Sequence, residues 1–237
     1  MSEWAAKRFW KSAEVEKQGA GFAVLLDGRA IKTPSKSQLV VPTEALADAI
    51  AAEWAAQEEK VDPTTMPVTR AANSAIDKVT PQRREVVDML AAYGESDLLC
   101  YRATGPEALV AQQAAAWDPL LTWAADTLDA RLQVGQGVMH VPQPANSLQN
   151  LHSEVDRFDA FAIAGFHDLV AISGSLILAL AVTKGRLDVA KAWQLSRIDE
   201  DWQISQWGED EEANVVAAKK FVAFKEGAIF FEMSQKS

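Results

Sequence analysis

The pattern of apolar residues changes near residue 43, and this change limits the folds that the chain can adopt. In the first forty residues, short apolar runs at 22–26, 29–33 and 38–41 are separated by Asp27-Gly28, by residues 34–37 and by Pro42. Short apolar runs bounded by Gly, Pro and Asp are typical of strands, and Asp-Gly favours a tight hairpin turn. A further strand is expected within residues 9–17. The beginning of the chain therefore predicts a small antiparallel sheet.

The rest of the chain has the three-to-four-residue apolar spacing of helices. Thr43 is the expected N-cap of the first helix, and Thr80-Pro81 is expected to start another, because proline is well suited to a first helical position. The link at 131–140 contains two glycines and no helical period. The helices expected from this spacing cover residues 44–58, 68–78, a segment from 80, 106–130, 147–161, 165–183, 187–207 and 210–224.

These two patterns predict an α+β protein in which a small N-terminal antiparallel β-rich domain precedes a larger, mainly α-helical domain. We expect the first domain to span residues 1–80, including a joining helix, and the second to span residues 81–237. The spacing leaves the boundary open between residues 42 and 80.

Charge and cysteine content exclude several classes of protein. The chain has 237 residues, with 23 Lys and Arg against 33 Asp and Glu, which gives a formal net charge of −10. Nucleic acids are bound mainly through clustered basic residues, so a nucleic-acid partner is not expected. Cys100 is the only cysteine and can form neither an internal disulfide nor a thiolate zinc site alone. The longest apolar stretch, 176–182, is too short to span a bilayer, so no membrane insertion is expected.

Motifs that would indicate catalysis are weak or missing in the sequence. His140, His152 and His167 lie in separate segments without metal-ligand spacing, and neither a P-loop nor a dinucleotide-binding motif occurs. We therefore expect no catalytic residue, no metal and no cofactor. Ser173-Gly-Ser175 resembles half of a nucleophile elbow, although small residues for close helix packing explain it better. A small serine hydrolase using Ser173 or Ser175 remains the alternative from the enzyme class.

An acidic block near the C-terminus is the most distinctive local feature. Residues 195–214 hold seven acidic residues and one basic residue, together with two tryptophans. The block is either a solvated acidic face beside core tryptophans or a surface that receives a basic or amphipathic protein, since Trp is a frequent interface anchor. The second interpretation also allows an acidic protein-interaction domain with an unrelated partner.

Several short segments, taken in order, resemble one protein family over residues 9 to 212. They include Glu53-Trp54-Ala-Ala-Gln57, Tyr93-Gly-Glu-Ser-Asp97, Ser173-Gly-Ser175, and Glu200 with Gln203 and Trp207-Gly208. The order and spacing of these segments resemble the assembly chaperones of the F-type ATP synthase catalytic sector that bind its alpha subunit. The resemblance implies a β-rich N-terminal domain and a helical C-terminal domain, which agrees with the patterns above.

The resemblance also implies a function without chemistry. Such a chaperone holds the unassembled alpha subunit and prevents its aggregation until the beta subunit replaces it. Carried over residue by residue, Glu200, Gln203, Trp207 and Gly208 are expected to bind the client, and Trp54 and Asp97 are expected to be structurally or functionally sensitive. A monomer is expected. Because no transit peptide is visible at the start, we expect a bacterial cytoplasmic protein, or a mitochondrial matrix protein if the chain is a trimmed eukaryotic form.

Overall fold

The computed structural model describes residues 7–236, which form two compact units. The first unit contains the described residues up to Arg83, with Asp159–Gly165 and the described residues from Ile229 onward. The second unit contains Arg84–Phe158 and Phe166–Ala228. The expectation about a transit peptide depends on the start of the chain, most of which lies outside the described residues. The predicted domain division between residues 80 and 81 stays a prediction. The two compact units differ from it, because the first unit also includes two segments from later in the chain.

The N-terminal strands form an antiparallel sheet around one central strand. They are β1 (Ala13–Gln18), β2 (Gly21–Leu26), β3 (Arg29–Ala30) and β4 (Val40–Val41). Strand β2 pairs with β1 along one edge, and β3 and β4 pair with successive parts of its other edge. Asp27 and Gly28 have φ values of 46° and 77°, as a tight hairpin turn requires. The predicted sheet is confirmed, with its first strand beginning at Ala13.

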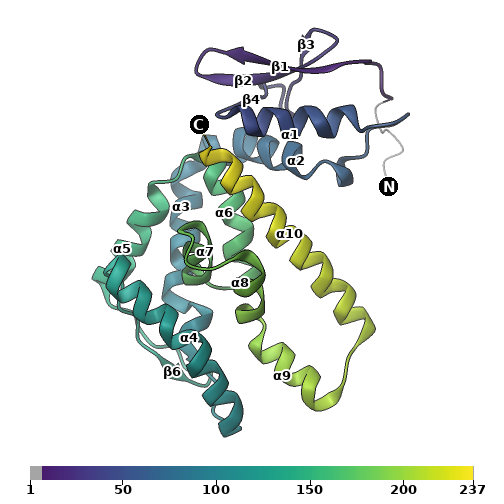
Figure 1. Cartoon of the computed structure of the whole chain (residues 1–237). Helices are drawn as coiled ribbons and strands as arrows, with labels where there is room; N and C mark the ends of the chain where they lie inside the picture. The colour runs from purple at the N-terminus through teal and green to yellow at the C-terminus, as the bar shows by residue number, and fades with distance from the viewer. Residues whose placement is uncertain (1–6, 237) are drawn as a thin grey trace. The chain divides into compact units, whose positions relative to one another are not determined.

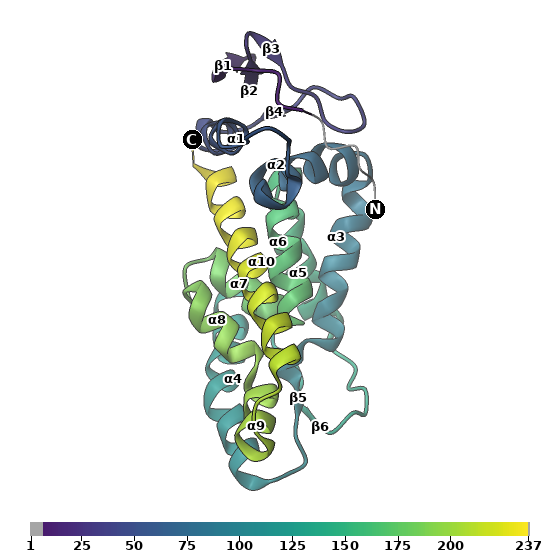
Figure 2. The same cartoon turned by 90° about the vertical axis from the view of Figure 1, so that its right-hand side faces the viewer.

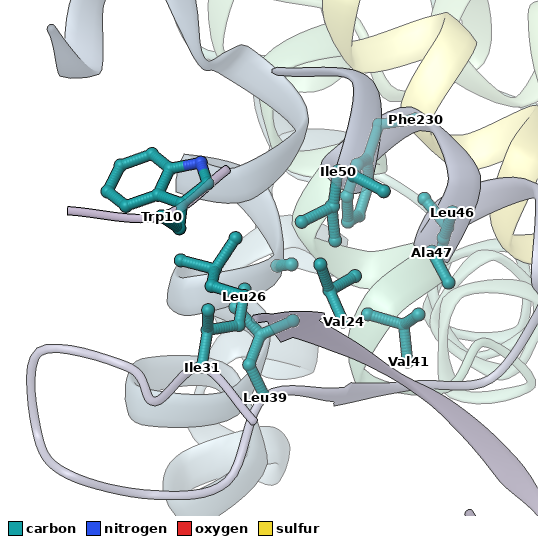
Figure 3. Close-up of a cluster of buried hydrophobic side chains, with 12 residues drawn as sticks. Trp10, Val24, Leu26, Ile31, Leu39, Val41, Leu46, Ala47, Ile50 and Phe230 are labelled. Carbon is teal, nitrogen blue, oxygen red and sulfur yellow. The ribbon is translucent and has the colours of Figure 1, made fainter. Parts of the chain in front are cut away.

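Helix α1 (Glu44–Ala55) covers one face of this sheet. The Thr43 side chain accepts a hydrogen bond from the Leu46 backbone N–H, which confirms Thr43 as the N-cap. Figure 3 shows the apolar side chains of the sheet pointing toward Leu46 and Ile50 of α1 and toward Phe230. The core of the first unit therefore lies between the sheet and α1.

The segment after α1 is helical but irregular. It contains η1 (Pro63–Thr65), α2 (Pro67–Ser74), the π-helical turn η2 (Ala75–Val79), η3 (Thr80–Gln82) and α3 (Arg83–Ala91). A 3₁₀ turn, η3, does begin at Thr80, but it follows η2 without a break, so the expectation that Thr80 is the N-cap of a separate helix was wrong. Thr80 has helical dihedral angles, and its hydroxyl donates to the Ala75 carbonyl at 2.8 Å. The π and 3₁₀ turns accommodate the missing N–H of Pro81, so the chain continues without a cap.

The second unit is built mainly from helices (Figure 1). Its elements, some of which extend into the first unit, are η4 (Ala92–Ser96), η5 (Leu98–Cys100), β5 (Tyr101–Arg102), α4 (Glu107–Leu128), β6 (Gly135–Gln136), α5 (Ala145–Asp156), α6 (Ala160–Ser173), α7 (Leu176–Thr183), α8 (Val189–Ser196), α9 (Ile198–Trp207) and α10 (Glu211–Gln235). Strands β5 and β6 pair in parallel. The predicted fold class, a small antiparallel β region followed by a mainly helical part, is confirmed.

Two of the predicted helices are each divided in two. The expected helix 165–183 breaks at Gly174, whose φ of +69° ends α6, and Ser175 then caps α7 by accepting from the Leu178 backbone N–H. The expected helix 187–207 breaks at Arg197, between α8 and α9. In the other direction, α10 continues to Gln235, well past the predicted end at 224. Among the described residues, none of the helices is both long and apolar enough to cross a membrane.

Candidate functional site

Helix α9 presents Glu200, Gln203 and Trp207 along one face. Their spacing of three and then four residues places the three side chains in one row on an α-helix. All three are exposed, and 80% of the Trp207 surface is accessible to solvent. Gly208 ends the helix with a φ of +89°, which an L side chain rarely adopts. The structure thus brings together the four residues expected to bind a client.

Asp199, beside this row, and Ile198, on the opposite side of α9, anchor the helix. The Gln113 side-chain amide donates a hydrogen bond to the Asp199 carboxylate at 2.5 Å, and Gln113 is only 1% exposed. Ile198 at the start of α9 is 6% exposed. The Trp117 indole N–H donates to the Leu195 carbonyl at 2.9 Å just before α9. These contacts hold α9 in place without using the side chains of its exposed row.

The exposed row has no partners within the described part of the chain. The side chains of Glu200, Gln203 and Trp207 form neither a hydrogen bond nor an ion pair with residues 7–236. By contrast, the neighbouring Asp201 lies 3.6 Å from the Arg197 guanidinium, measured between carboxylate oxygen and Nε. The row therefore carries a carboxylate, an amide and an indole that are all available to another molecule.

The first turns of α10 add exposed apolar groups that sequence reasoning missed. Figure 1 shows α9 leading through a short loop into α10. Val215 and Val216 are 50% and 53% exposed, and they lie three and four residues after the last of the acidic residues 209–212. Their exposure within an otherwise acidic stretch depends on how α10 packs, which the spacing alone does not specify.

The segment around Trp54 makes structural contacts within the first unit. The Trp54 ring packs edge-on against Trp10, with 5.1 Å between ring centroids, and Trp54 is half-buried. The Glu53 carboxylate accepts hydrogen bonds from the backbone N–H groups of Val68 at 2.7 Å and Thr69 at 2.8 Å, which caps the start of α2. This pairing joins the end of α1 to the start of α2.

Gln57 braces the connector between α1 and α2 in the same way. Its side-chain amide donates to the Glu53 carbonyl at 3.0 Å, and its side-chain oxygen accepts from the Asp62 backbone N–H at 2.7 Å. Gln57 is 4% exposed. The Glu-Trp-x-x-Gln segment is therefore a structural element that fixes the path of the chain into α2.

Asp97 is a buried carboxyl group at the junction of η5 and α7. Its carboxylate accepts hydrogen bonds from the Leu99 backbone N–H at 3.0 Å, the Ile177 backbone N–H at 3.0 Å and the Ser175 hydroxyl at 2.7 Å. Burial raises the pKa of Asp97 from 3.8 to about 6, while these hydrogen bonds act in the opposite direction. Asp97 thus holds together segments that are distant in sequence.

The two serines of the hydrolase alternative are also structural. Ser173 and Ser175 are 4% and 0% exposed. The Ser173 hydroxyl donates to the Leu169 carbonyl at 2.5 Å, whereas the Ser175 hydroxyl donates to Asp97. Neither hydroxyl has a histidine partner in the described part of the chain. Neither serine has the access or the base that an activated nucleophile needs.

Cys100 and the metal-ligating side chains that the structure describes likewise give no indication of catalysis. Cys100 is buried, and desolvation raises the pKa of its thiol to about 12, which makes it unreactive. Within residues 7–236, no group of three or more His, Cys, Asp and Glu side chains is placed to hold a metal ion. The exposed row of α9 is thus the candidate site.

One protein family and a mitochondrial relative are similar to this chain in sequence. Residues 7–125 match the family described as ATP12 chaperone protein. The chain is 25% identical over 223 residues to the mitochondrial protein atp12 of Schizosaccharomyces pombe, covering 89% of this chain and 76% of the relative.

Solved structures are similar over nearly the whole chain. The crystal structure of Atp12 from Paracoccus denitrificans has a TM-score of 0.95 and 51% identity, covering 97% of this chain and 99% of that one. An aspartate-to-lysine variant of the same Paracoccus protein gives a TM-score of 0.96 with 51% identity, covering 99% and 100%. The Atu1473 protein of Agrobacterium tumefaciens gives 0.92 with 42% identity, covering 96% and 85%. The chain belongs to the ATP12 chaperone family, whose members matched here are named as chaperones and not as enzymes.

Proposed function

We propose that this chain is an assembly chaperone of the ATP synthase catalytic sector. It binds the unassembled alpha subunit through the exposed row of α9 and prevents its aggregation until the beta subunit takes its place. The observation that carries this proposal is that Glu200, Gln203 and Trp207 lie in one row, exposed and without partners in the described chain. The other segments of the family resemblance have structural roles, so this row is the part left for recognition.

The physical requirements of such a chaperone fit the chemistry of the row. A subunit of an obligate complex exposes an apolar interface of roughly 2,000 Å² or more before assembly, and such a surface aggregates. The chaperone must cover part of that interface and still be displaced by the beta subunit. A row with one indole and two polar groups suits this exchange, because the indole anchors the contact and the polar groups limit its affinity.

The acidic character of the chain supports the same proposal. A net charge of −10 keeps a complex with an aggregation-prone client in solution. The Glu200 carboxylate in the same row as Trp207 favours a client surface with basic or amphipathic character. The chaperone acts as a monomer, in the bacterial cytoplasm or the mitochondrial matrix, and needs no cofactor.

An aggregation assay tests the proposed function. Purified alpha subunit is diluted from denaturant, and light scattering is followed with and without this chain. We expect suppression at near-stoichiometric amounts without added nucleotide. Suppression that requires nucleotide hydrolysis by this chain, or unchanged aggregation at a several-fold excess, would contradict the proposal. Selective capture of a different protein from the native host would favour an acidic interaction domain with another client.

A further inference from the structure

A groove in the second unit is lined by α4 and by residues 186–195, which lead into and form most of α8. These two helices lie on the left of Figure 2. Its volume is about 370 Å³. The apolar part of its lining includes Pro119, Leu120, Leu187 and Leu195. A second depression shares Ala115 and Pro119 with it and continues along α4. The groove therefore offers an apolar surface that continues along α4.

Pro119 leaves one backbone carbonyl of α4 without its usual helical donor at this groove. Proline lacks a backbone N–H, so within α4 the carbonyl of Ala115 has no donor four residues later. Ala115 and Pro119 both line the groove, and both are exposed. The helix thus presents a backbone acceptor beside its apolar surface, where a bound segment can donate a backbone N–H.

Two basic side chains are part of the groove lining. Arg186 and Lys191 both line it and are exposed, and neither forms an ion pair with another residue in the range 7–236. Asp188 lies between them in sequence, but its carboxylate accepts the Lys191 backbone N–H at 2.8 Å and caps α8. With Asp188 counted, Arg186 and Lys191 leave one net positive charge beside the apolar groove, on a chain with a net charge of −10.

We propose that this groove is a second contact for the client and that it binds a client segment in which an apolar side chain lies next to a carboxylate. The apolar side chain enters the groove between Pro119 and Leu195, and the carboxylate faces Arg186 and Lys191. This inference rests on the proposed function, because it assigns the groove to the same alpha subunit. Its chemistry is opposite in charge to that of the α9 row, so the two contacts select different parts of one client.

A charge-reversal experiment tests the electrostatic part of this assignment. The double variant Arg186→Glu, Lys191→Glu is compared with Lys78→Glu, Arg84→Glu, which changes the net charge equally at two exposed cations elsewhere. Affinity for alpha subunit is measured by interferometry at low and moderate salt. We expect a loss of about tenfold or more for the groove variant and about twofold or less for the control, since like charges at a contact are repulsive.

The two proposals fail in different ways in this experiment. Normal binding by the unmodified chain with equal, small losses in both double variants would overturn the groove assignment alone. Absence of binding by the unmodified chain would overturn the proposed function and the groove assignment with it. Thermal melting of each variant shows whether the fold is retained, and all four side chains are exposed, so retention is expected.

Site-specific cross-linking identifies the occupant directly. Cys100 is buried and unreactive, so a benzophenone maleimide labels Gln112→Cys at the groove edge selectively. The control is Gln149→Cys, exposed on α5. We expect only the first to cross-link an alpha-subunit peptide, and that peptide to carry Asp or Glu within four residues of a large apolar side chain. A peptide without acids, a cross-link between two copies of this chain, or equal labelling from both positions would overturn the assignment.

Discussion

The Ser175 hydroxyl donates a hydrogen bond to the Asp97 carboxylate at 2.7 Å, across 78 positions of sequence, and both residues are 0% exposed. The same carboxylate accepts backbone N–H groups at the start of η5 and at the start of α7. One buried carboxyl group therefore fixes the junction of two segments in the second unit. A buried acceptor that satisfies three donors is difficult to replace, because each donor left unpaired costs free energy.

Removal of this acceptor should destabilise the protein strongly. We expect Asp97→Ala to lower the free energy of unfolding by about 3 kcal/mol or more, since two backbone N–H groups and one hydroxyl lose their acceptor in a buried site. Urea unfolding followed by circular dichroism measures this change. A loss near zero would mean that water enters the site and replaces the carboxylate.

The raised pKa of Asp97 also predicts a pH dependence of stability. Burial raises its pKa from 3.8 to about 6, so between these values the folded protein holds a proton that the unfolded chain has released. The contribution of Asp97 to the free energy of unfolding is therefore fully present below about pH 4 and is lost as the pH rises through 6. About two pKa units correspond to roughly 3 kcal/mol.

The comparison of wild type with Asp97→Asn isolates this contribution, because other titrating groups are common to both proteins. The free energy of unfolding of each is measured from pH 4 to pH 7. We expect the stability of the wild type, relative to the variant, to fall across this range. A difference that is constant with pH would show that the pKa of Asp97 is the same in the folded and unfolded states.

Ser175→Ala should weaken the fold without removing the capacity to bind. The Ser175 oxygen caps α7 by accepting from the Leu178 backbone N–H at 3.0 Å, in addition to its bond to Asp97. Loss of a cap and of one buried hydrogen bond together cost about 2 kcal/mol. We expect a lower melting temperature and unchanged client affinity at a temperature where the variant is folded. An esterase activity that disappears in this variant would revive the hydrolase alternative.

Trp54→Arg should act through folding. The Trp54 ring packs against Trp10, and the Trp10 indole N–H donates to the Trp54 carbonyl at 3.3 Å. A guanidinium in this half-buried position loses the ring contact and is poorly hydrated, so we expect a loss of about 3 kcal/mol. Soluble yield and melting temperature should fall together, whereas Trp54→Phe should be much milder. An unchanged melting curve with lost client binding would identify Trp54 as a surface anchor instead.

The sequence predicted those parts of the fold that depend on local chemistry. Asp27-Gly28 and Thr43 were recognised because positive φ and N-capping each favour a short list of residue types. The break at Gly174 was missed, because the flanking residues are all compatible with one continuous helix. The partnership of Asp97 with Ser175 could not be predicted, since it depends on how distant segments pack.

The candidate site could be predicted only in part for the same reason. Helical spacing places Glu200, Gln203 and Trp207 in one row, but spacing alone does not say whether that row faces the core or the solvent. The orientation of α9 is fixed by the burial of Ile198, opposite the row, and by the hydrogen bond from Gln113 on α4 to Asp199, beside the row. That hydrogen bond joins residues 86 positions apart and has no local signal in the sequence.

The most direct test of the account is the affinity of Glu200→Lys for alpha subunit, measured beside Glu211→Lys. Both glutamates are exposed and lie in the first turn of their helices, α9 and α10, so the two changes alter net charge and helix-end electrostatics alike. We predict that Glu200→Lys lowers the affinity about tenfold or more, while Glu211→Lys changes it little and both variants melt near the wild-type temperature. Equal, small losses in the two variants would contradict the assignment of the α9 row as the client-binding site.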